Sequence, residues 1–512
     1  MPHMAASSTT TARLAYAGFG ILATLMGMAA GHLVAALLDP AASPVLAVGS
    51  TVIDLTPTPV KEWAVATFGT ADKPILVGSV MVGAVVLAAI GGLLARRRFT
   101  SGALVLVLLV AAAGAAAVLR PGAGPLDVVP ALVTALAGVG ALWWLTISAP
   151  DTGGTRHTGH GTTRRGVLIS AGVLAAAAAA MGGAGRLVSG LRTDPRDVAL
   201  PPPTDPAPAF PRGLEGEYPG IPSFRTPTDS FYRIDTRLSL PTSGIEDYEL
   251  VIDGDVENEV RLSFADLTKM DLIERDITLT CVSNDIGGPY VGGARWLGVR
   301  LTDLLDMAGV GGGADQILST DVDGMTISTP LDVATDGRDA MIAIGMNGEA
   351  LPREHGFPVR MVVPGLYGFV SACKWLTRMT LTTYDEQQAY WTERDWATDA
   401  PIKIASRIDT PKSFEEIDSG STFIGGVAWA QDRGIGKVEL QVDGGSWQPA
   451  RLGPSAGVDY WRQWYLPWDA EPGQHTLTVR AVSEEGEVQS PAKAMPFPEG
   501  ASGYQQIIVR VQ

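Results

Sequence analysis

The sequence contains little cysteine and little histidine. Only Cys281 and Cys373 occur among 512 residues, which excludes a disulfide framework and a cysteine-rich metal cluster. A single bridge between these two thiols stays open, because an oxidising compartment would permit it. Of the six histidines only His32 lies in a long apolar run, and no Cys-x-x-Cys-His motif occurs. A membrane haem with two histidine ligands and a covalently attached haem are therefore disfavoured, and we expect no haem.

Basic residues are scarce in the second part of the chain. Residues 1–190 hold 11 Lys and Arg against 6 Asp and Glu, whereas the remaining residues hold 27 against 48. This acidic excess argues against a nucleic-acid partner, which requires a basic face. It is typical instead of a solvated domain. A length of 512 residues also exceeds one ordinary core, so two or three structural units are expected.

Charged residues are nearly absent from five long apolar segments within residues 1–190. Four of them carry no charge, and each has about the 17–25 residues needed to cross the hydrocarbon of a bilayer. The fifth is rich in alanine and glycine and has Arg186 near its end. We predict an all-α region of five transmembrane helices in the lipid bilayer, at Leu14–Leu38, Pro74–Ala95, Gly102–Leu119, Val128–Ala149 and Gly166–Val188.

The arginines between these segments indicate the orientation. Seven basic residues lie on one side of the membrane, against Lys61, Lys73 and Arg120 on the other. The positive-inside rule places the richer side in the cytoplasm. We therefore expect a multi-pass protein of the cell membrane with a cytoplasmic N-terminus and an extracytoplasmic domain after the fifth helix. The seven residues are Arg13, Arg96, Arg97, Arg98, Arg156, Arg164 and Arg165.

Proline content and hydrophobic patterns divide the rest of the chain. Residues 191–227 include Pro201, Pro202 and Pro203 and few apolar runs, which predicts an extended linker. Residues 228–400 mix strand-like and helix-like patterns and predict an α+β domain. In that domain we expect strands at Tyr248–Ile252, Asp276–Cys281 and Val359–Val363, and helices at Leu262–Met270 and Leu301–Ala308.

From residue 401 to 512 the pattern changes to regularly spaced β-type alternation. Asp443 and Gly444 form a typical hairpin turn pair. We therefore predict a separate all-β domain with the arrangement of a β-sandwich. The strands are expected at Thr422–Trp429, Lys437–Val442, Tyr460–Leu466, His475–Val482 and Gln506–Val511.

The region around Cys281 carries the candidate chemistry. Cys281 ends a predicted strand within Leu279–Asn284, and Gly293–Val299 follows. A cysteine at a strand end, followed by small polar residues, can present its thiolate to a soft metal while backbone groups contact a ligand. A single cysteine taken alone is more often a small packed side chain. The surrounding motifs distinguish these alternatives.

This segment resembles the sulfite oxidase family, in which a strand-end cysteine is followed by an asparagine and then by a Gly-x-x-Trp-x-Gly-Val element. The resemblance continues through most of the chain after the linker. Any single block is weak, whereas their common order and spacing are specific. The other matching blocks are Thr226–Tyr232, Met346–Glu349, His355–Arg360, Val363–Gly365, Gly368, Lys374–Trp375, Gly426–Trp429, Val438–Glu439, Asp443–Gly445 and Arg480–Ala481.

The resemblance implies a fold, a cofactor and a set of site residues. The fold is a sulfite-oxidase-type molybdopterin domain followed by an immunoglobulin-like β-sandwich, which often mediates homodimers in the family. Cys281 is implied to be the catalytic protein ligand of one molybdenum, whose other sulfurs come from a molybdopterin. The phosphate of that cofactor needs cations and backbone amides. The implied cofactor-binding residues are Asp229, Tyr232, Arg233, Ser283, Asn284, Thr320, His355, Arg360, Gly365, Gly368, Ser371 and Lys374.

The sequence departs from the family at two positions. The sulfite and nitrate branches place an arginine soon after the metal cysteine, but here Asp285 follows Asn284. Those branches also have a tyrosine where this chain has Met325. Losing one cation and one phenol removes groups that bind a small dianion, so sulfite is disfavoured as the substrate. The candidates to replace the missing cation are Arg233, Arg295 and Arg353.

Three functions follow from this resemblance. The first is an oxidoreductase that transfers an oxygen atom and two electrons, with an external redox partner or the quinone pool as electron partner. The second is a reductase of S-oxides such as oxidised methionine, as in a bacterial branch of the family. The third is a catalytically silent binding module on a membrane anchor. A transporter is disfavoured because the five apolar segments hold no acidic residue.

Arg164 and Arg165 before the fifth apolar segment resemble a twin-arginine export signal. The alternative is an ordinary pair of cytoplasmic anchoring arginines. The weak hydrophobicity of this segment and the cofactor domain behind it favour the signal, because a cofactor inserted in the cytoplasm requires a domain that is already folded when it crosses. We predict an internal, uncleaved signal at Thr163–Leu168.

Overall fold

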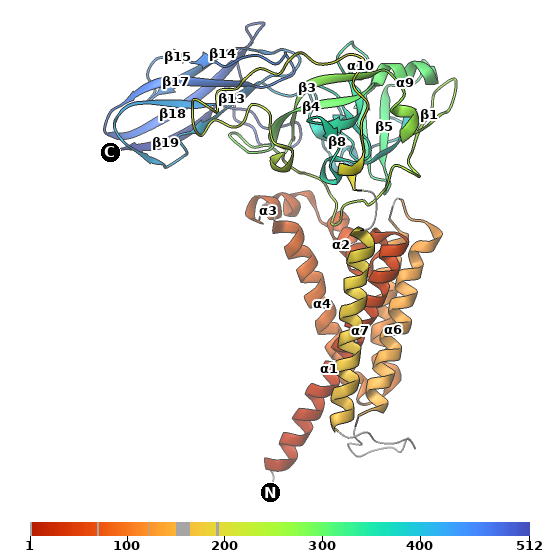
Figure 1. Ribbon diagram of the computed structural model, residues 1–512. Coiled ribbons are helices and arrows are strands. Elements are labelled where there is room, and N and C mark those ends of the chain that lie inside the picture. The colour runs from red at the N-terminus through yellow and green to blue at the C-terminus, as the bar shows by residue number, and fades with distance from the viewer. Residues whose placement is uncertain (1–2, 69–70, 121, 150–163, 191–193) are drawn as a thin grey trace. The chain divides into compact units, whose positions relative to one another are not determined.

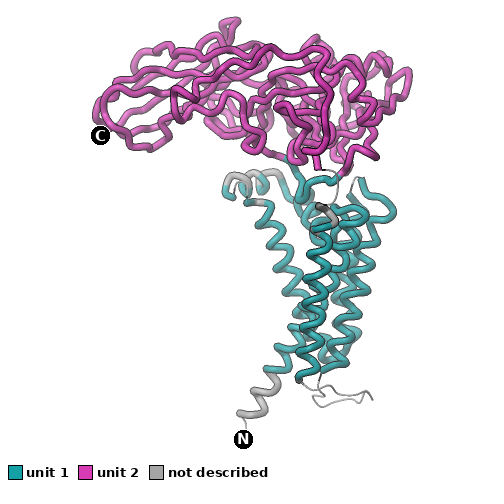
Figure 2. Tube along the Cα trace, in the orientation of Figure 1, with its two compact units in different colours: residues 1–192, 235–242 teal, residues 193–234, 243–512 magenta. Residues whose placement is uncertain are grey.

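The chain is divided into two compact units (Figures 1 and 2). The computed structural model describes residues 3–68, 71–120, 122–149, 164–190 and 194–512. The first unit consists of residues 1–192 and 235–242, and the second of residues 193–234 and 243–512. Arg156 and Thr163, which belong to the predicted orientation and export motifs, lie outside the described residues.

The first unit is a bundle of helices. Within the described residues, five helices are long and apolar enough to span a membrane, which confirms the predicted number of apolar spans. They cover Thr11–Leu37, Lys73–Ala95, Phe99–Val118, Pro125–Ile147 and Arg165–Gly185. The described helices of the unit are α1 (His3–Leu37), α2 (Pro44–Leu55), α3 (Thr58–Phe68), α4 (Asp72–Ala95), α5 (Phe99–Val118), α6 (Val129–Ile147) and α7 (Arg164–Gly190).

Small residues let helices of the first unit approach closely. A Cβ on Gly20 of α1 would lie 2.0 Å from the carbonyl oxygen of Ala88, and one on Gly92 of α4 would lie 2.0 Å from that of Tyr16. Such backbone contact is typical of helices in a bilayer, where lipid provides no hydrophobic drive for helices to associate. Large apolar side chains such as Leu136 are exposed on the unit's surface, which is compatible with a lipid-facing bundle.

Charged side chains of the first unit are paired near helix ends. Arg120, after α5, forms ion pairs with Asp39 at 2.7 Å and with Asp127 at 2.9 Å. Residues 235–242, although distant in sequence, belong to this unit, and Asp235 pairs with Lys73 at 2.8 Å. Pairing offsets part of the cost of placing these charges among apolar helices.

Two sheets form the first part of the second unit (Figure 1). Sheet A has the strand order β3-β4-β7-β8, with β9 paired to β7, and sheet B has the order β2-β1-β10-β5-β6. The strands are β1 (Glu249–Gly254), β2 (Val260–Ser263), β3 (Leu272–Thr280), β4 (Val291–Arg300), β5 (Gln316–Asp321), β6 (Thr326–Pro330), β7 (Met341–Met346), β8 (Glu349–Ala350), β9 (Arg360–Val362) and β10 (Leu376–Thr382). The α-helices between them are α8 (Phe264–Leu267), α9 (Leu301–Ala308), α10 (Leu331–Ala334) and α11 (Gly368–Ser371).

Sheet A is buried on both faces. Along β7, Ile342 and Ile344 belong to a core that also contains residues of sheet B, whereas Met341 and Ala343 belong to a second core on the other face. A strand covered on both sides has a continuous apolar sequence without alternation. For this reason the alternation of polar and apolar residues predicts β3 but not β7.

The elements expected between residues 228 and 400 are present with shifted ends. β3 starts at Leu272, before the expected position, and ends at Thr280, one residue before Cys281. The helix expected from residue 262 is only the single turn α8, because β2 continues to Ser263, whose hydroxyl caps the helix by accepting from the amide of Asp266 at 3.2 Å. α9 has the predicted bounds and ends at Gly309 in the left-handed conformation.

Two further sheets share one core in residues 401–512, which we call the C-terminal domain. Their strand orders are β11-β13-β17-β16 and β12-β19-β18-β14-β15. Ile408 and Ile424 of the first sheet pack with Leu477 and Val509 of the second. The strands are β11 (Ala405–Thr410), β12 (Glu416–Ile417), β13 (Gly420–Trp429), β14 (Ile435–Val442), β15 (Gln448–Pro449), β16 (Arg451–Leu452), β17 (Arg462–Ala470), β18 (Gly473–Ser483) and β19 (Gln505–Val511).

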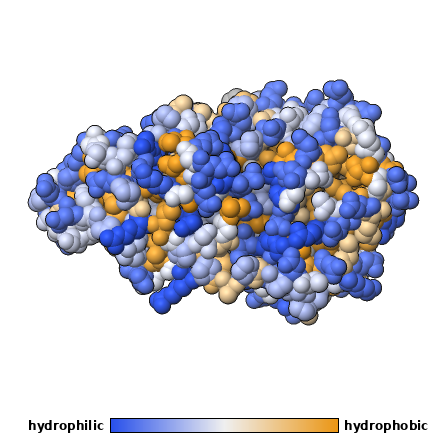
Figure 3. All heavy atoms as spheres, turned by 90° about the horizontal axis from the view of Figure 1, so that it is seen from above, coloured by the Kyte–Doolittle hydropathy of each residue, from blue (hydrophilic) through white to orange (hydrophobic). Residues whose placement is uncertain are grey.

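The surface of the molecule mixes polar and apolar side chains. On the face in Figure 3, hydrophilic residues surround several separate groups of hydrophobic ones. Large apolar residues that are exposed in the second unit include Phe414 and Met495. Scattered apolar side chains of this kind are normal on a water-facing surface.

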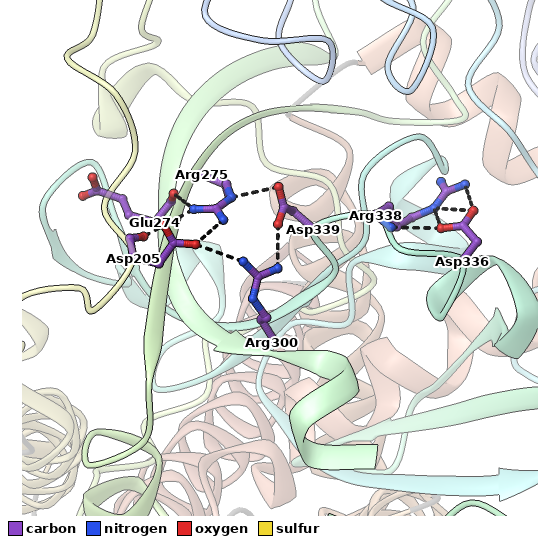
Figure 4. Close-up of polar contacts among 7 residues, drawn as sticks. All are labelled: Asp205, Glu274, Arg275, Arg300, Asp336, Arg338 and Asp339. Carbon is purple, nitrogen blue, oxygen red and sulfur yellow. Dashed lines mark hydrogen bonds and ion pairs between the residues drawn. The ribbon is translucent and has the colours of Figure 1, made fainter. Parts of the chain in front are cut away.

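The proline-rich linker lies along the edge of sheet A. The carbonyl of Leu272 accepts from the amides of Thr204 at 2.8 Å and Asp205 at 3.1 Å. The Asp205 carboxylate is also part of a closed ring of ion pairs (Figure 4), in which it contacts Arg275 at 2.5 Å and Arg300 at 3.0 Å. Both arginines contact Asp339 at 2.8 Å. The linker is thus attached to the domain that it precedes.

Candidate functional site

Sheet A brings the predicted thiol and the predicted anion-binding arginine onto one framework. Cys281 follows β3, and Arg360 is the first residue of β9, which reaches β3 through β7 and β4. His355 ends a 3-10 turn five residues before Arg360. Residues far apart in the sequence therefore lie at or near strand ends of one sheet.

The loop after β3 holds Cys281 in a buried position. The thiol-bearing residue is 8% exposed, its amide donates to the carbonyl of Tyr290 at 3.0 Å, and its carbonyl accepts from the amide of Asn284 at 3.1 Å. Burial raises the pKa of the Cys281 thiol, while hydrogen bonds from Ser283 and the charge of Lys374 act in the opposite direction. A positive charge beside the sulfur would offset that cost of burial.

Arg360 is a buried guanidinium without a carboxylate partner among the described residues. It is 5% exposed and donates to the backbone carbonyls of His355 at 3.1 Å and Ala372 at 3.4 Å. Its guanidinium carbon lies 5.0 Å from the ring centroid of Trp296. Burial lowers the pKa of Arg360 to about 10. A buried cation held only by neutral groups is suited to bind an anionic ligand.

His355 lies among several cations and is held neutral. Its Nε2 is 3.1 Å from the carbonyl oxygen of Thr228, to which the neutral ring can donate. Burial, followed by the charge of Arg360, lowers the pKa of His355 to about 4, and Lys374 and Arg233 add to the effect. Three predicted cationic residues therefore act on one histidine.

Tyr232, at the end of the block Thr226–Tyr232, lies near both Cys281 and Arg360. Burial raises the pKa of Tyr232, with a further contribution from the Cys281 charge and an opposing one from Arg360. Its ring stacks on Phe231 at a centroid distance of 5.2 Å, and Phe231 contacts His355 edge-on at 5.4 Å. We call Cys281, Tyr232, Arg233, His355, Arg360 and Lys374 the thiol–cation cluster.

Some predicted residues use their side chains elsewhere. The exposed Asp229 accepts from the hydroxyl of Ser230 at 3.1 Å. Asn284 Oδ1 accepts from the amide of Tyr290, and the Ser371 hydroxyl contacts the carbonyl oxygens of its own loop at 3.0 and 3.1 Å. The printed bonds of Asn284 and Ser371 hold the backbone of the loops around the cluster.

The remaining predicted positions are backbone or peripheral ones. Gly365 has a φ of +82° and faces Arg338, since a Cβ there would lie 2.6 Å from that guanidinium. Gly368 lies near the end of β3, since a Cβ added to it would be 3.8 Å from the carbonyl oxygen of Thr280. Thr320 belongs to sheet B, and in the described part of the chain no hydrogen bond or ion pair joins it to the cluster.

The arginines that were candidates to replace the missing cation differ in their surroundings. Arg295 is paired with Asp276 at 2.6 Å and lies 3.4 Å from Glu274, so its charge is compensated. Arg353 lies over the ring of Phe357 at 5.8 Å. Arg233 is the one of the three whose charge acts on His355.

Tyr367 is a buried residue near the thiol that the motifs did not identify. It is 4% exposed, and burial raises the pKa of its phenol to about 12, with a contribution from the Cys281 charge. Tyr367, Asn284 and Asp285 also line a small hollow of about 30 Å³ against the C-terminal domain. Neither Cys281 nor Arg360 lines this hollow, so it is separate from the thiol–cation cluster. The sequence could have indicated Tyr367, because it lies between the two candidate residues Gly365 and Gly368.

Comparison with known proteins identifies relatives over the same region. Residues 237–391 match the oxidoreductase molybdopterin binding domain family. Mitochondrial sulfite oxidase of Homo sapiens is 31% identical over 323 residues, which cover 52% of this chain and 57% of that protein. Sulfite oxidase of Gallus gallus is 28% identical over 319 residues, which cover 52% of this chain and 68% of that protein.

The relatives are matched over only part of their length. The chain spans less than two thirds of the human protein. Among solved structures, the sulfane dehydrogenase SoxCD from Paracoccus pantotrophus aligns with a TM-score of 0.49 and 24% identity, over 56% of this chain and 83% of that chain.

Proposed function

The chain contains a molybdopterin-binding oxidoreductase domain of the sulfite oxidase family, and we propose that it is a membrane-anchored, extracytoplasmic enzyme that transfers an oxygen atom and two electrons. The observation that carries this proposal is the thiol–cation cluster, in which Cys281 lies within the influence of Lys374 and the buried Arg360 has no carboxylate partner among the described residues. The molybdenum cofactor implied by the domain is a metal with sulfur ligands and an anionic phosphate.

The residues present fit that cofactor. A soft thiolate is the appropriate protein ligand for such a metal, and Cys281 is a buried thiol with no disulfide partner. Arg360, Lys374 and Arg233 offer the positive charge that an anionic cofactor requires. When bound, the cofactor would supply two-electron chemistry coupled to transfer of an oxygen atom.

The chain's own residues would bind and orient. Cys281 would fix the metal, and the buried guanidinium of Arg360 would neutralise the cofactor's phosphate. The neutral His355 would donate either to Thr228 or to the pterin, and Tyr232 would close one side of the site. Ser283, Asn284, Ser371, Gly365 and Gly368 would support these groups through the loop backbone, with Asp229 and Thr320 further out.

The arrangement in the cell is part of the proposal. Residues 1–190 would be the five-helix anchor, residues 191–227 the linker, residues 228–400 the molybdopterin domain and residues 401–512 an immunoglobulin-like sandwich that pairs two copies of the chain. The N-terminus would be cytoplasmic, and the twin-arginine signal would export the folded domain. A redox protein or the quinone pool would exchange electrons with it, and haem is not required.

A reductase of S-oxides such as oxidised methionine is the second candidate. It is favoured by the acidic Asp285, which is exposed directly after the loop residue Asn284, and by the pairing of Arg295 with Asp276. Both features reduce the positive charge offered to a dianion, whereas an uncharged S-oxide does not need it. Parallel assays of sulfite oxidation and of methionine sulfoxide reduction separate the two enzymes.

Elemental analysis tests the metal assignment. From molybdate-fed cells, wild-type protein should contain about one molybdenum per chain, and Cys281→Ala should lose most of the metal and nearly all activity because a soft metal loses its protein ligand. Cys373→Ala is the matched control: its thiol is also buried, yet we expect wild-type metal content. Molybdenum-free wild-type protein would identify the chain as a catalytically silent module. Equal metal in both variants would remove Cys281 from the site.

A further inference from the structure

The strand that carries Cys281 is an outer strand of its sheet. β3 pairs only with β4 in sheet A, so one edge of β3 has no partner within that sheet. The start of this edge is covered by the linker at Asp205, as described above. The end of the edge, next to the thiol, is covered by the C-terminal domain. A covered edge leaves no unpaired backbone groups and keeps the strand in place.

Thr278 is held at all three of its polar groups by the C-terminal domain. Its amide donates to the carbonyl of Asp459 at 2.9 Å, and its hydroxyl accepts from the amide of Trp461 at 2.9 Å. Its carbonyl accepts from Nε2 of Gln431 at 2.8 Å. Thr278 has no exposed surface and lies three residues before Cys281. The position of the strand end is therefore set from outside its own sheet.

Gln431 provides the side-chain part of this contact. It is 2% exposed, and its Nε2 also lies 3.4 Å from the hydroxyl of Thr280, the residue before Cys281. Its Oε1 accepts no hydrogen bond from any described residue. Burying an amide oxygen without a donor is unfavourable, so an apolar residue would serve the core of the C-terminal domain better. The favourable contribution of Gln431 therefore comes from its Nε2 donor, which faces β3.

The far end of the loop after Cys281 is held by the same domain. Arg407 of β11 donates to the carbonyl of Gly288 at 2.8 Å. Gly287 has a φ of +75°, and an added Cβ there would lie 2.4 Å from the amide nitrogen of Gln505. The loop that carries the thiol is thus fixed by the C-terminal domain both before and after Cys281.

We propose that Gln431 is a positioning residue for the Cys281 thiolate, and that the C-terminal domain is a working part of the cofactor site. The role rests on the proposed function, since it is the metal that requires the thiol in one place. Gln431 would act through Thr278 and Thr280, the two residues that its Nε2 contacts.

Hydrogen exchange of the full-length protein in detergent tests this proposal. Gln431→Glu keeps the shape but replaces the donor with an acceptor that faces the Thr278 carbonyl. We expect peptides over residues 277–283 to exchange about tenfold faster, as for loss of one buried hydrogen bond. In metal-loaded protein, the absorption from thiolate to molybdenum should shift at equal molybdenum content. Thr278→Val removes only the hydrogen bond from the amide of Trp461, and it should also accelerate exchange of these peptides. It replaces Gln431→Glu as the test if that variant does not fold.

Gln489→Glu is the matched control. Gln489 is also 2% exposed in the same domain, and its Nε2 donates to a carbonyl, that of Gly503, at 2.7 Å. Its variant should accelerate exchange near residues 481–503 and leave residues 277–283 unchanged. Wild-type exchange at 277–283 in Gln431→Glu and Thr278→Val, or equal acceleration there in Gln489→Glu, would overturn the proposal. The exchange experiment can also be done on metal-free protein. A missing cofactor would therefore contradict the proposed function, whereas the exchange rates would still test the role of Gln431.

Discussion

At the scale of single residues, two buried arginines of the second unit have opposite surroundings. Arg407 forms an ion pair with Asp409 at 2.9 Å, and burial raises the pKa of that carboxyl. Arg360 has only backbone carbonyls and the ring of Trp296 around its charge within the described residues. A buried pair is destabilised by loss of one partner, whereas an uncompensated charge already has an unfavourable desolvation energy.

Replacing each arginine by methionine should therefore give different results. Arg360→Met should lose the cofactor, because the phosphate loses its buried cation, while the thermal unfolding temperature of the metal-free protein stays equal or rises. Arg407→Met should lower the free energy of unfolding by about 3–5 kcal/mol, because Asp409 is left buried and unpaired. Molybdenum analysis and thermal unfolding measure both effects. Wild-type molybdenum content in Arg360→Met would contradict the assigned role.

The spacing of motifs selected the residues of the thiol–cation cluster as a candidate site, but it did not predict the direction of each side chain. Cys281 and Arg360 are carried by strands of sheet A, and the charge of Arg360 acts on His355, so the order of the blocks along the chain selected residues that share one framework. The hydroxyl of Ser371 contacts its own loop, and Asp229 faces solvent. Such orientations depend on competing local hydrogen bonds, which a motif does not encode.

At the scale of elements, the closed ring of Asp205, Arg275, Asp339 and Arg300 attaches the linker to sheet A. The sequence predicted the linker from its prolines, but not its attachment, because the four residues of the ring come from the linker, β3, β4 and the loop before β7. The hydrogen bond from Arg275 holds the pKa of Asp205 below its usual range. Its ion pairs thus stabilise the attached linker above about pH 4, and this contribution is lost as the pH falls through the lowered pKa.

Asp205→Asn should release the linker at neutral pH. We expect faster hydrogen exchange of residues 204–208 in the variant, and a further acceleration on acidification only in the wild type. Asp194→Asn is the control, because Asp194 also has a lowered pKa but forms its ion pair with the nearby Arg196 and not with a residue of sheet A in the described part of the chain. Exchange that does not differ between wild type and Asp205→Asn at pH 7 would show that the backbone bonds to Leu272 suffice.

At the scale of the whole molecule, the chain combines five apolar helices with an acidic oxidoreductase domain. Composition predicts this division well, because membrane-spanning length and apolar character are properties of whole segments. If the second unit is exported with its cofactor, as we propose, it must cross the membrane in a folded state. An export route that threads an unfolded chain would take apart the arrangement of β3, β9 and the C-terminal domain.

Replacing Arg164 and Arg165 by lysine tests this export route. If these two residues form a twin-arginine signal, the double variant should keep residues 194–512 on the cytoplasmic side, where protease added to spheroplasts does not reach them. Arg96→Lys with Arg97→Lys is the control, because it changes a neighbouring basic turn between α4 and α5 without altering charge. The orientation of the first four spans should be equal in both variants, since lysine preserves the positive-inside signal. Full protease access to the domain in the Arg164 and Arg165 variant would show that these residues are ordinary anchoring charges and that the domain folds after transport.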